Sequence, residues 1–293
     1  MKKLLLILVF LTATNLFAAD GDTTFTAVLN EGSSPQKVSV MLKEYSHKET
    51  LKGKTYSVEG NIFTISIDGS SVSDTLPYSD SFGAELIDID KNDKTKEILI
   101  YSGGSPDYNY WVYKYDKGIV LLLEAEYYDE FIPDGSGLIN AKKWAGFCML
   151  KDVYKYSKDR KKLEAEPVDF YTVKYTFDED ETEKDYIVTA EKSFKLYAKR
   201  NPACTVVTDS KGVMKVNGYD AKDVSVDVKM GDKLIISGYD SKYMTIKSPD
   251  GESEYYWVWI QMKTTSGKTG WILMNAYDSD CWNEYVSGVV FAG

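Results

Sequence analysis

Apolar and polar residues alternate in short runs along most of the chain after residue 24, and no long stretch repeats with the 3.6-residue period of a helix. The runs are rich in Val, Ile, Thr, Tyr and Phe, and are separated by Gly, Asn, Asp and Pro. This pattern is typical of an all-β protein. Asp68-Gly69 and Asp116-Lys117-Gly118 lie between such runs and predict hairpin turns. The runs predict strands over residues 37–42, 54–59, 62–67, 97–101, 110–115 and 119–124.

The first 19 residues have a different pattern. Two lysines precede an apolar run over residues 4–11, and the segment ends on small residues at Ala18 and Ala19. A membrane-spanning helix needs about 20 apolar residues, so this run is too short to span. The pattern predicts a secretory signal peptide over residues 1–19. We therefore expect an exported protein, in the periplasm, on the cell surface or outside the cell.

The chain without this segment is strongly acidic. Once Lys2 and Lys3 are removed, 33 basic residues remain against 45 acidic ones, a net charge of 33 − 45 = −12. That balance disfavours nucleic acids and anionic membranes as partners. An acidic run at residues 178–185 repels itself and cannot lie in a core. We expect it to be a linker between domains at 22–177 and 186–293, or alternatively a solvated hairpin tip inside one domain.

The stretch over residues 82–100 holds the clearest candidate for a metal site. Asp88, Asp90 and Asn92 alternate along it, so a tight loop can turn three oxygen ligands toward one centre. Calcium prefers such hard ligands, six to eight of them at roughly 2.3–2.6 Å. The alternative is a metal-free turn that its own Asx hydrogen bonds stabilise. The expected ligands of one structural Ca²⁺ are Asp88, Asp90, Asn92, the Lys94 carbonyl and the Glu97 carboxylate.

The same stretch resembles the FG-GAP or VCBS family, whose repeats build β-propellers of the integrin-α type. Phe82-Gly83 stands at the start of the motif, the Asp-x-Asp-x-Asn loop follows, and Gly103-Gly104-Ser105-Pro106 stands where the family has Gly-Ala-Pro. The chain departs from the family at Asp93, in place of Gly, and at Lys96, in place of a carboxylate. An echo of the motif occurs at residues 132–137. The resemblance implies a partial or degenerate β-propeller-like domain and a calcium ion.

Residues 186–273 resemble the bacterial SH3 family. They contain an opening strand at 186–190, a Gly231-Asp232 turn, a strand that begins at Trp259, and the hairpin Gly267-Lys268-Thr269-Gly270-Trp271. An insertion at residues 209–227 departs from the family. The resemblance implies a small SH3-like β-barrel. It also implies an extracellular ligand such as a cell-wall peptide or an envelope protein.

Aromatic residues cluster in this C-terminal segment. Amphipathic aromatic side chains are favoured at binding surfaces. Alternation along a strand puts Trp257 and Trp259 on one face, which is exposed unless another layer covers it. The alternative places about half of the aromatic side chains in a barrel core. The residues expected to line a ligand groove are Tyr255, Tyr256, Trp257, Trp259 and Trp271.

Three cysteines allow at most one disulfide within the chain. We expect it between Cys204 and Cys281, with three buried thiols, Cys148 included, as the alternative. His47 is the one histidine in the sequence and lies in a polar stretch. A Ser-His-Asp or Cys-His site would have to use it, and it cannot supply a zinc site with several histidine ligands.

These features favour a non-catalytic binding protein of the cell envelope over an enzyme. Two alternatives stay open at this point. One is a cell-envelope hydrolase whose carboxylate pair cannot be recognised among 45 acidic residues, with the SH3-like module as its targeting arm. The other is a scaffold that meets another protein through the open edge of an incomplete propeller.

Overall fold

The computed structural model describes residues 23–29, 36–52, 54–77, 81–93, 95–104, 107–175, 184–201, 203–208, 214–218, 220–247, 254–276 and 279–290. The signal peptide predicted over residues 1–19 lies outside these ranges. The chain forms two compact units. The first comprises residues 1–142 and 152–166, and the second comprises residues 143–151 and 167–293. In the described ranges, no helix has the length and apolar character that a membrane crossing requires.

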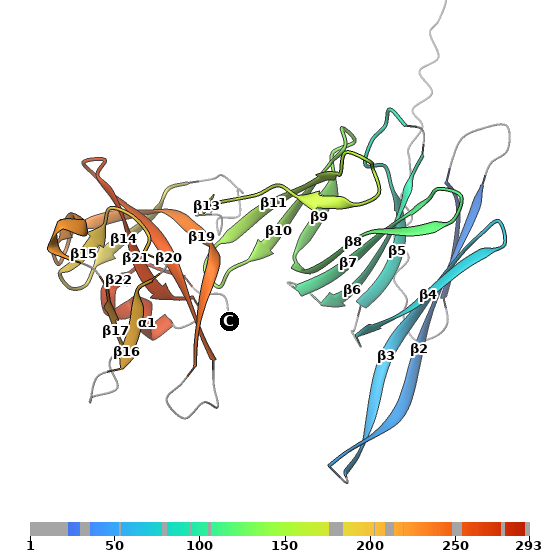
Figure 1. Ribbon diagram of the computed structural model, residues 1–293, viewed down its shortest axis with the longest axis horizontal. Helices are drawn as coiled ribbons and strands as arrows, with labels where there is room; N and C mark the ends of the chain where they lie inside the picture. Colours follow the sequence, from blue (N-terminus) through green and yellow to red (C-terminus); the bar gives the residue numbers. More distant parts are fainter. Residues whose placement is uncertain are drawn as a thin grey trace, which may run out of the picture. The chain divides into compact units, whose positions relative to one another are not determined.

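Strands β1–β12 form three antiparallel sheets of four strands each within the described residues, and in each sheet neighbours in sequence are neighbours in space (Figure 1). The first sheet contains β1 (Thr23–Val28), β2 (Lys37–Leu51), β3 (Lys54–Ile67) and β4 (Ser70–Pro77). The second contains β5 (Ser81–Ile87), β6 (Glu97–Gly104), β7 (Asp107–Tyr115) and β8 (Ile119–Tyr128). The third contains β9 (Glu130–Pro133), β10 (Leu138–Trp144), β11 (Met149–Tyr156) and β12 (Leu163–Ala165).

The predicted all-β class is confirmed, and each of the six predicted strands lies inside an observed one. The two strands predicted at 54–59 and 62–67 are one continuous strand, β3. Gly60 and Asn61 were expected to break it, but they pair with β2 on one side and with β4 on the other. The predicted turn at Asp68-Gly69 joins β3 to β4. Its φ angles of 47° and 82° are the left-handed values that a two-residue hairpin turn requires.

The second sheet buries both of its faces. Ile98 and Ile100 of β6 belong to an apolar core that they share with the first sheet. Leu99, between them, belongs to a different core with side chains of β9–β12, such as Phe131 and Ile139. Since neighbouring side chains in a strand point to opposite faces, the second sheet is packed between the other two. The first unit is therefore a stack of three meandering sheets.

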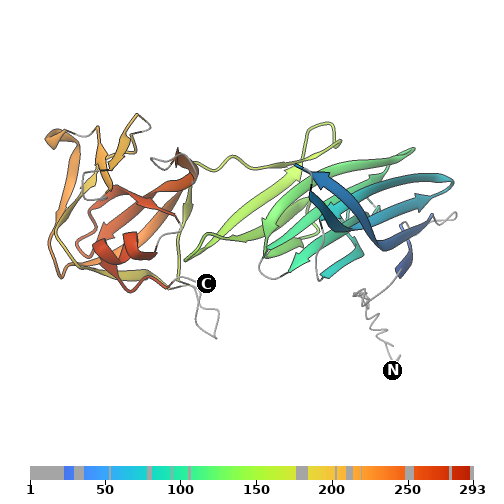
Figure 2. The same ribbon diagram turned by 90° about the horizontal axis from the view of Figure 1, so that it is seen from below.

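The second unit is built on one curled sheet (Figure 2). Its strand order, within the residues described, is β18-β15-β21-β20-β19-β14-β22, and β13 pairs with β19 as well. A hairpin of β16 and β17, a 3-10 turn at Ala221–Asp223 and the helix α1 (Ser279–Tyr285) accompany it. The strands are β13 (Phe170–Thr172), β14 (Tyr186–Ala190), β15 (Phe194–Tyr197), β16 (Thr205–Thr208), β17 (Met214–Asn217), β18 (Val224–Val228), β19 (Lys233–Lys247), β20 (Glu254–Thr264), β21 (Thr269–Asn275) and β22 (Val286–Ser287).

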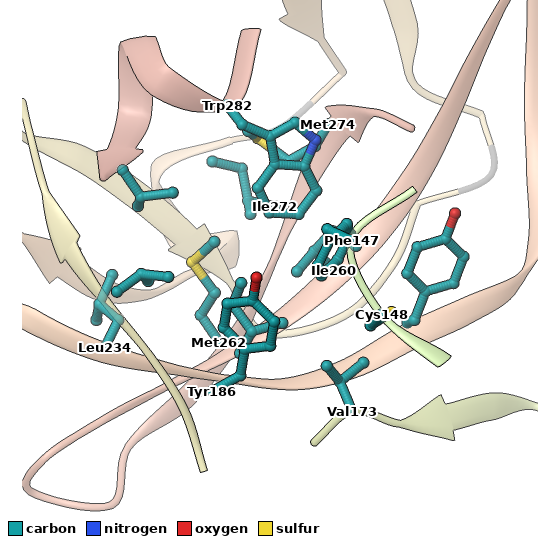
Figure 3. Close-up of a cluster of buried hydrophobic side chains, with 14 of the residues drawn as sticks. Phe147, Cys148, Val173, Tyr186, Leu234, Ile260, Met262, Ile272, Met274 and Trp282 are labelled. Carbon is teal, nitrogen blue, oxygen red and sulfur yellow. The ribbon is translucent and has the colours of Figure 1, made fainter. Parts of the chain in front are cut away.

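Residues 143–151, which comprise the end of β10, the connection and the start of β11, belong to the second unit and contribute side chains to its core. Phe147 is fully buried, and its ring centroid lies 4.5 Å from that of Trp282, 5.8 Å from Tyr186 and 5.9 Å from Tyr239 (Figure 3). Cys148 is fully buried in the same cluster. The β10–β11 hairpin therefore begins in the first unit, and the residues at its far end form part of the core of the second unit.

The observed boundary differs from the predicted linker at residues 178–185. The second unit resumes at Pro167, because β13 pairs with β19 of that unit and Val173 is buried in its core. Residues 178–183 lie outside the described part, but Tyr175 and Lys184 on either side pair with each other across N–O distances of 2.9 and 3.2 Å. This pairing fits the alternative of a hairpin tip inside one unit.

The C-terminal elements occur in the predicted order. β14 covers the opening strand at 186–190, β20 contains Trp259, and Gly267 has a left-handed φ of 88° in the turn before β21. Gly270 is required for a different reason. A Cβ atom there would lie 2.4 Å from Ser225 Oγ and 2.6 Å from Leu196 Cβ. Only glycine at this position of β21 therefore lets β15 and β18 approach β21 this closely.

Candidate functional site

The loop between β5 and β6 contains the predicted calcium ligands other than Glu97, which begins β6, and short hydrogen bonds within the loop determine its shape. Asp90 Oδ1 accepts bonds from the backbone N of Asn92 (3.2 Å) and from Asn92 Nδ2 (3.0 Å). Asp93 Oδ1 accepts bonds from the backbone N and from Oγ1 of Thr95, at 3.0 and 2.8 Å. These are two successive Asx turns, the arrangement expected of a self-stabilised turn. Lys94 lies outside the described residues.

Arg160, which lies on the β11–β12 turn, forms ion pairs with two aspartates of this loop. Its Nη1 lies 2.9 Å from Asp90 Oδ2, and its Nη2 lies 2.6 Å from Asp93 Oδ2. Lys114 Nζ lies 3.4 Å from the same Asp93 oxygen. The hydrogen bond from Arg160, followed by those from Asn92, lowers the pKa of Asp90 below its ordinary value. Burial acts to raise the pKa of Asp93, but the hydrogen bonds from Thr95 and the charge of Lys114 outweigh it, so this pKa is also lowered.

Glu97 lies beneath the loop and is fully buried. Its Oε1 accepts a bond from the Tyr156 hydroxyl at 2.5 Å, and its Oε2 accepts one from the backbone N of Ile89 at 3.3 Å. Burial raises the pKa of Glu97 above its ordinary value, although both hydrogen bonds and the charge of Lys114 act in the opposite direction. The carboxylate is therefore part of the internal support of the loop.

A second loop, at residues 134–137, supports the first from another side. The backbone N of Lys91 donates to the carbonyl of Gly135 (3.1 Å), and the backbone N of Gly137 donates to the carbonyl of Ile89 (2.7 Å). Asp134 Oδ1 accepts bonds from the backbone N of Ser136 and Leu138. The echo that the sequence shows at residues 132–137 is thus an Asx turn that pairs with the first loop.

The described side chains do not fit a calcium shell. A ligand set needs several oxygens that face one centre, but Asp90 faces Arg160 and Asn92, and Glu97 faces Tyr156 and the backbone of Ile89. Asp88 Oδ1 is buried and has no hydrogen-bond partner among the described residues. In the described part of the chain, no three His, Cys, Asp or Glu side chains come together as a metal site.

The aromatic residues predicted to line a groove are buried instead. Trp257, Trp259 and Trp271 each keep less than a tenth of their surface exposed. The guanidinium of Arg200 lies 4.9 Å from the ring of Trp271, and the ring of Phe170 meets it edge-on at 5.5 Å. The side chain of Tyr255 lies outside the described part, and Tyr256 is partly exposed. Strand alternation is correct here, but other residues cover the face that was expected to be open.

The expected disulfide between Cys204 and Cys281 is not formed in the structure. Cys204 is a buried free thiol whose Sγ lies 3.9 Å from Met244 Sδ, and Cys148 is a second buried free thiol. Nothing is described of the side chain of Cys281. Burial raises the pKa of both described thiols, which makes them poor nucleophiles.

Two further polar clusters, one buried and one partly exposed, were not predicted from the sequence. In the first, the Tyr128 hydroxyl lies 2.6 Å from Asp152 Oδ2 and 2.7 Å from the Tyr154 hydroxyl. In the second, Arg200 donates to the buried Asp240 at 2.9 Å and also bonds the carboxylate of Asp169. Each carboxylate has a hydrogen-bonding partner and is held in place by it, as expected of structural polar groups.

The first unit has a two-stranded extension, here called the arm, formed by residues 43–51 of β2 and 54–59 of β3. β1 pairs with β2 only over residues 37–42, and β4 pairs with β3 only over residues 60–67. Beyond these points β2 and β3 pair only with each other among the described strands, and Figure 1 shows them extending past the sheet. Tyr56 on the arm is 51% exposed.

Comparisons of the chain with protein-family models, with curated proteins and with solved structures give no match.

Proposed function

We propose that the protein is an exported, non-catalytic binding protein that docks to another protein of the cell envelope through its arm. The observation that supports this is the length of β2 and β3 beyond their neighbours. A row of backbone N–H and C=O groups runs along each outer edge of the arm, and such edges accept an added strand. The partner we propose is an extended segment of another protein that pairs along one edge.

Energetics support the same proposal. A two-stranded ribbon alone is marginally stable in water, and a third strand adds hydrogen bonds and side-chain contacts. The described arm side chains are polar or aromatic, and they include Tyr56 on the outside. Residues 43–59 contain four lysines and three glutamates in an otherwise acidic chain. The arm can therefore approach an acidic partner that the rest of the chain would repel.

The family assignments belong to this proposal as well. Each blade of a β-propeller is a four-stranded antiparallel sheet, and we propose that the three stacked meanders are a partial propeller-like domain. The SH3-like assignment of the second unit rests on the order of β14, β19, β20 and β21 and on the Gly267 turn. We do not assign a ligand groove to Trp257, Trp259 or Trp271, because all three are buried.

Photo-crosslinking tests the docking proposal. A photoreactive phenylalanine analogue at the position of Tyr56 should give one discrete adduct in intact cells, and mass spectrometry should map it to an extended segment of the partner. The matched control places the same analogue at Tyr127, which is also exposed but lies on β8. Adducts that are as frequent from Tyr127 as from Tyr56 would remove the arm as the docking element.

A further inference from the structure

The loop at residues 88–96 brings several carboxylates close together in a tight turn, although lysines at 91, 94 and 96 balance their formal charge in the sequence. Asp88, Asp90 and Asp93 lie within six positions, and Glu97 follows them. In loops of this sequence type a calcium ion neutralises such groups. The described structure brings Arg160 and Lys114 to Asp90 and Asp93 instead.

The geometry of Arg160 is that of a bridging group. Each nitrogen of the guanidinium fork takes one carboxylate oxygen, Oδ2 of Asp90 and Oδ2 of Asp93. The planar fork of an arginine holds its two acceptors in a fixed geometry, whereas the ammonium of a lysine is a compact point charge on a flexible stem. The guanidinium also lies over the ring of Tyr156, with Cζ 4.1 Å from the ring centroid. Tyr156 in turn donates to Glu97, so one stacked unit connects the carboxylates of Asp90, Asp93 and Glu97.

The backbone of Arg160 adds an independent observation. Its φ is +55°, a left-handed value at which glycine or asparagine is favoured. The turn that holds it is tight, with the backbone N of Arg160 2.8 Å from the carbonyl of Ser157. A residue with a Cβ atom is strained in this conformation. The side-chain contacts with Asp90 and Asp93 give a physical reason for an arginine at such a position.

We propose that Arg160 takes the place of the metal ion in this loop, so that the β5–β6 loop is ordered without calcium. The cation comes from the β11–β12 turn, 67 and 70 positions away from the two aspartates that it bridges. Arg160 thereby joins the second and third sheets of the stack. This inference does not depend on the arm or on any partner.

Thermal unfolding of the full mature chain tests the proposal. The wild-type midpoint should be the same in millimolar calcium and in chelator. Arg160→Gln keeps the strained backbone but removes both ion pairs, and it should lower the midpoint by roughly 2–4 °C, the shift that about 1 kcal/mol gives for a domain of this size. Lys161→Gln makes the same charge change at the neighbouring side chain, which is 81% exposed, and should leave the midpoint unmoved.

Two further variants separate the bridge from the turn. Arg160→Gly should lower the midpoint less than Arg160→Gln, because glycine removes the backbone strain together with the ion pairs. Asp90→Asn combined with Arg160→Gln should cost little more than Arg160→Gln alone, since the arginine change already removes the contact with Asp90. A wild-type midpoint that rises with calcium and falls with chelator would overturn the proposal. So would an Arg160→Gln chain that melts like the Lys161→Gln control.

Discussion

Phe147→Ala is expected to unfold the second unit at a far lower denaturant concentration than the wild type, because it empties the centre of that core. Phe147 is fully buried against Trp282, Tyr186 and Tyr239. Removal of a buried Phe side chain costs about 3–5 kcal/mol, from lost burial and from the cavity that remains. That is a large part of the 5–15 kcal/mol that stabilises a typical domain.

Hydrogen exchange read by mass spectrometry locates the effect. Peptides from β14, β19 and β21 should lose protection in Phe147→Ala, although position 147 lies on the β10–β11 connection. Lys151→Ala is the control, because this exposed residue lies at the other end of the same segment. If the loss of protection were confined to β9–β12, residues 143–151 would not be part of the second core.

Leu99→Ala and Ile100→Ala are each expected to destabilise the first unit by about 2–5 kcal/mol, the usual cost of truncating a buried Leu or Ile. The two residues are neighbours on β6, so their side chains point in opposite directions. Ile100 lies in the core shared with the first sheet, and Leu99 lies in the core shared with the third. Adjacent positions with equally large costs are the signature of a sheet buried on both faces.

Urea unfolding measures both costs, and Val120→Ala is the matched control. Val120 belongs to the same sheet, at its β8 edge, and is 40% exposed, so its truncation should change stability by less than about 1 kcal/mol. If only one of Leu99 and Ile100 were sensitive, the second sheet would cover one core and the three-sheet stack would be incorrect.

Alternation of apolar residues predicted segments of β2, β3, β6, β7 and β8, because each of these strands lies against a core on at least one face, but it did not identify the other strands of the first unit. The same pattern does not say which neighbours a strand has, so the interruption expected at Gly60-Asn61 is absent from β3. It also does not say whether a face is covered. Trp257 and Trp259 share a face as predicted, and both are buried.

The candidate loop was located from the sequence, which left open whether a metal or the loop's own hydrogen bonds stabilise it. The spacing of Asp88, Asp90 and Asn92 identifies a turn rich in oxygen atoms, which a metal or hydrogen bonds can stabilise equally well. What distinguishes the two is Arg160, and its distance along the chain makes the ion pairs invisible to a local motif. The one local signal was Asp93, a carboxylate where the resembling family has glycine, and this residue is the second partner of Arg160.

The same limit applies to the boundary between the units. The acidic run at residues 178–185 was the strongest change in composition, yet the second unit resumes earlier, at Pro167, and also includes residues 143–151. Contacts such as Phe147 with Trp282 join residues more than a hundred positions apart. Composition along the chain carries no information about such contacts.

Shortening of the arm tests the proposed function most directly. Replacement of residues 46–59 by Asn-Gly should close a two-residue hairpin on the Tyr45 and Gly60 pair while it leaves every contact of β1 and β4 in place. The shortened chain should melt like the wild type and should fail to retain the envelope protein that crosslinks at Tyr56. Undiminished retention of that protein by a folded, shortened chain would contradict the proposal that the arm is the docking element.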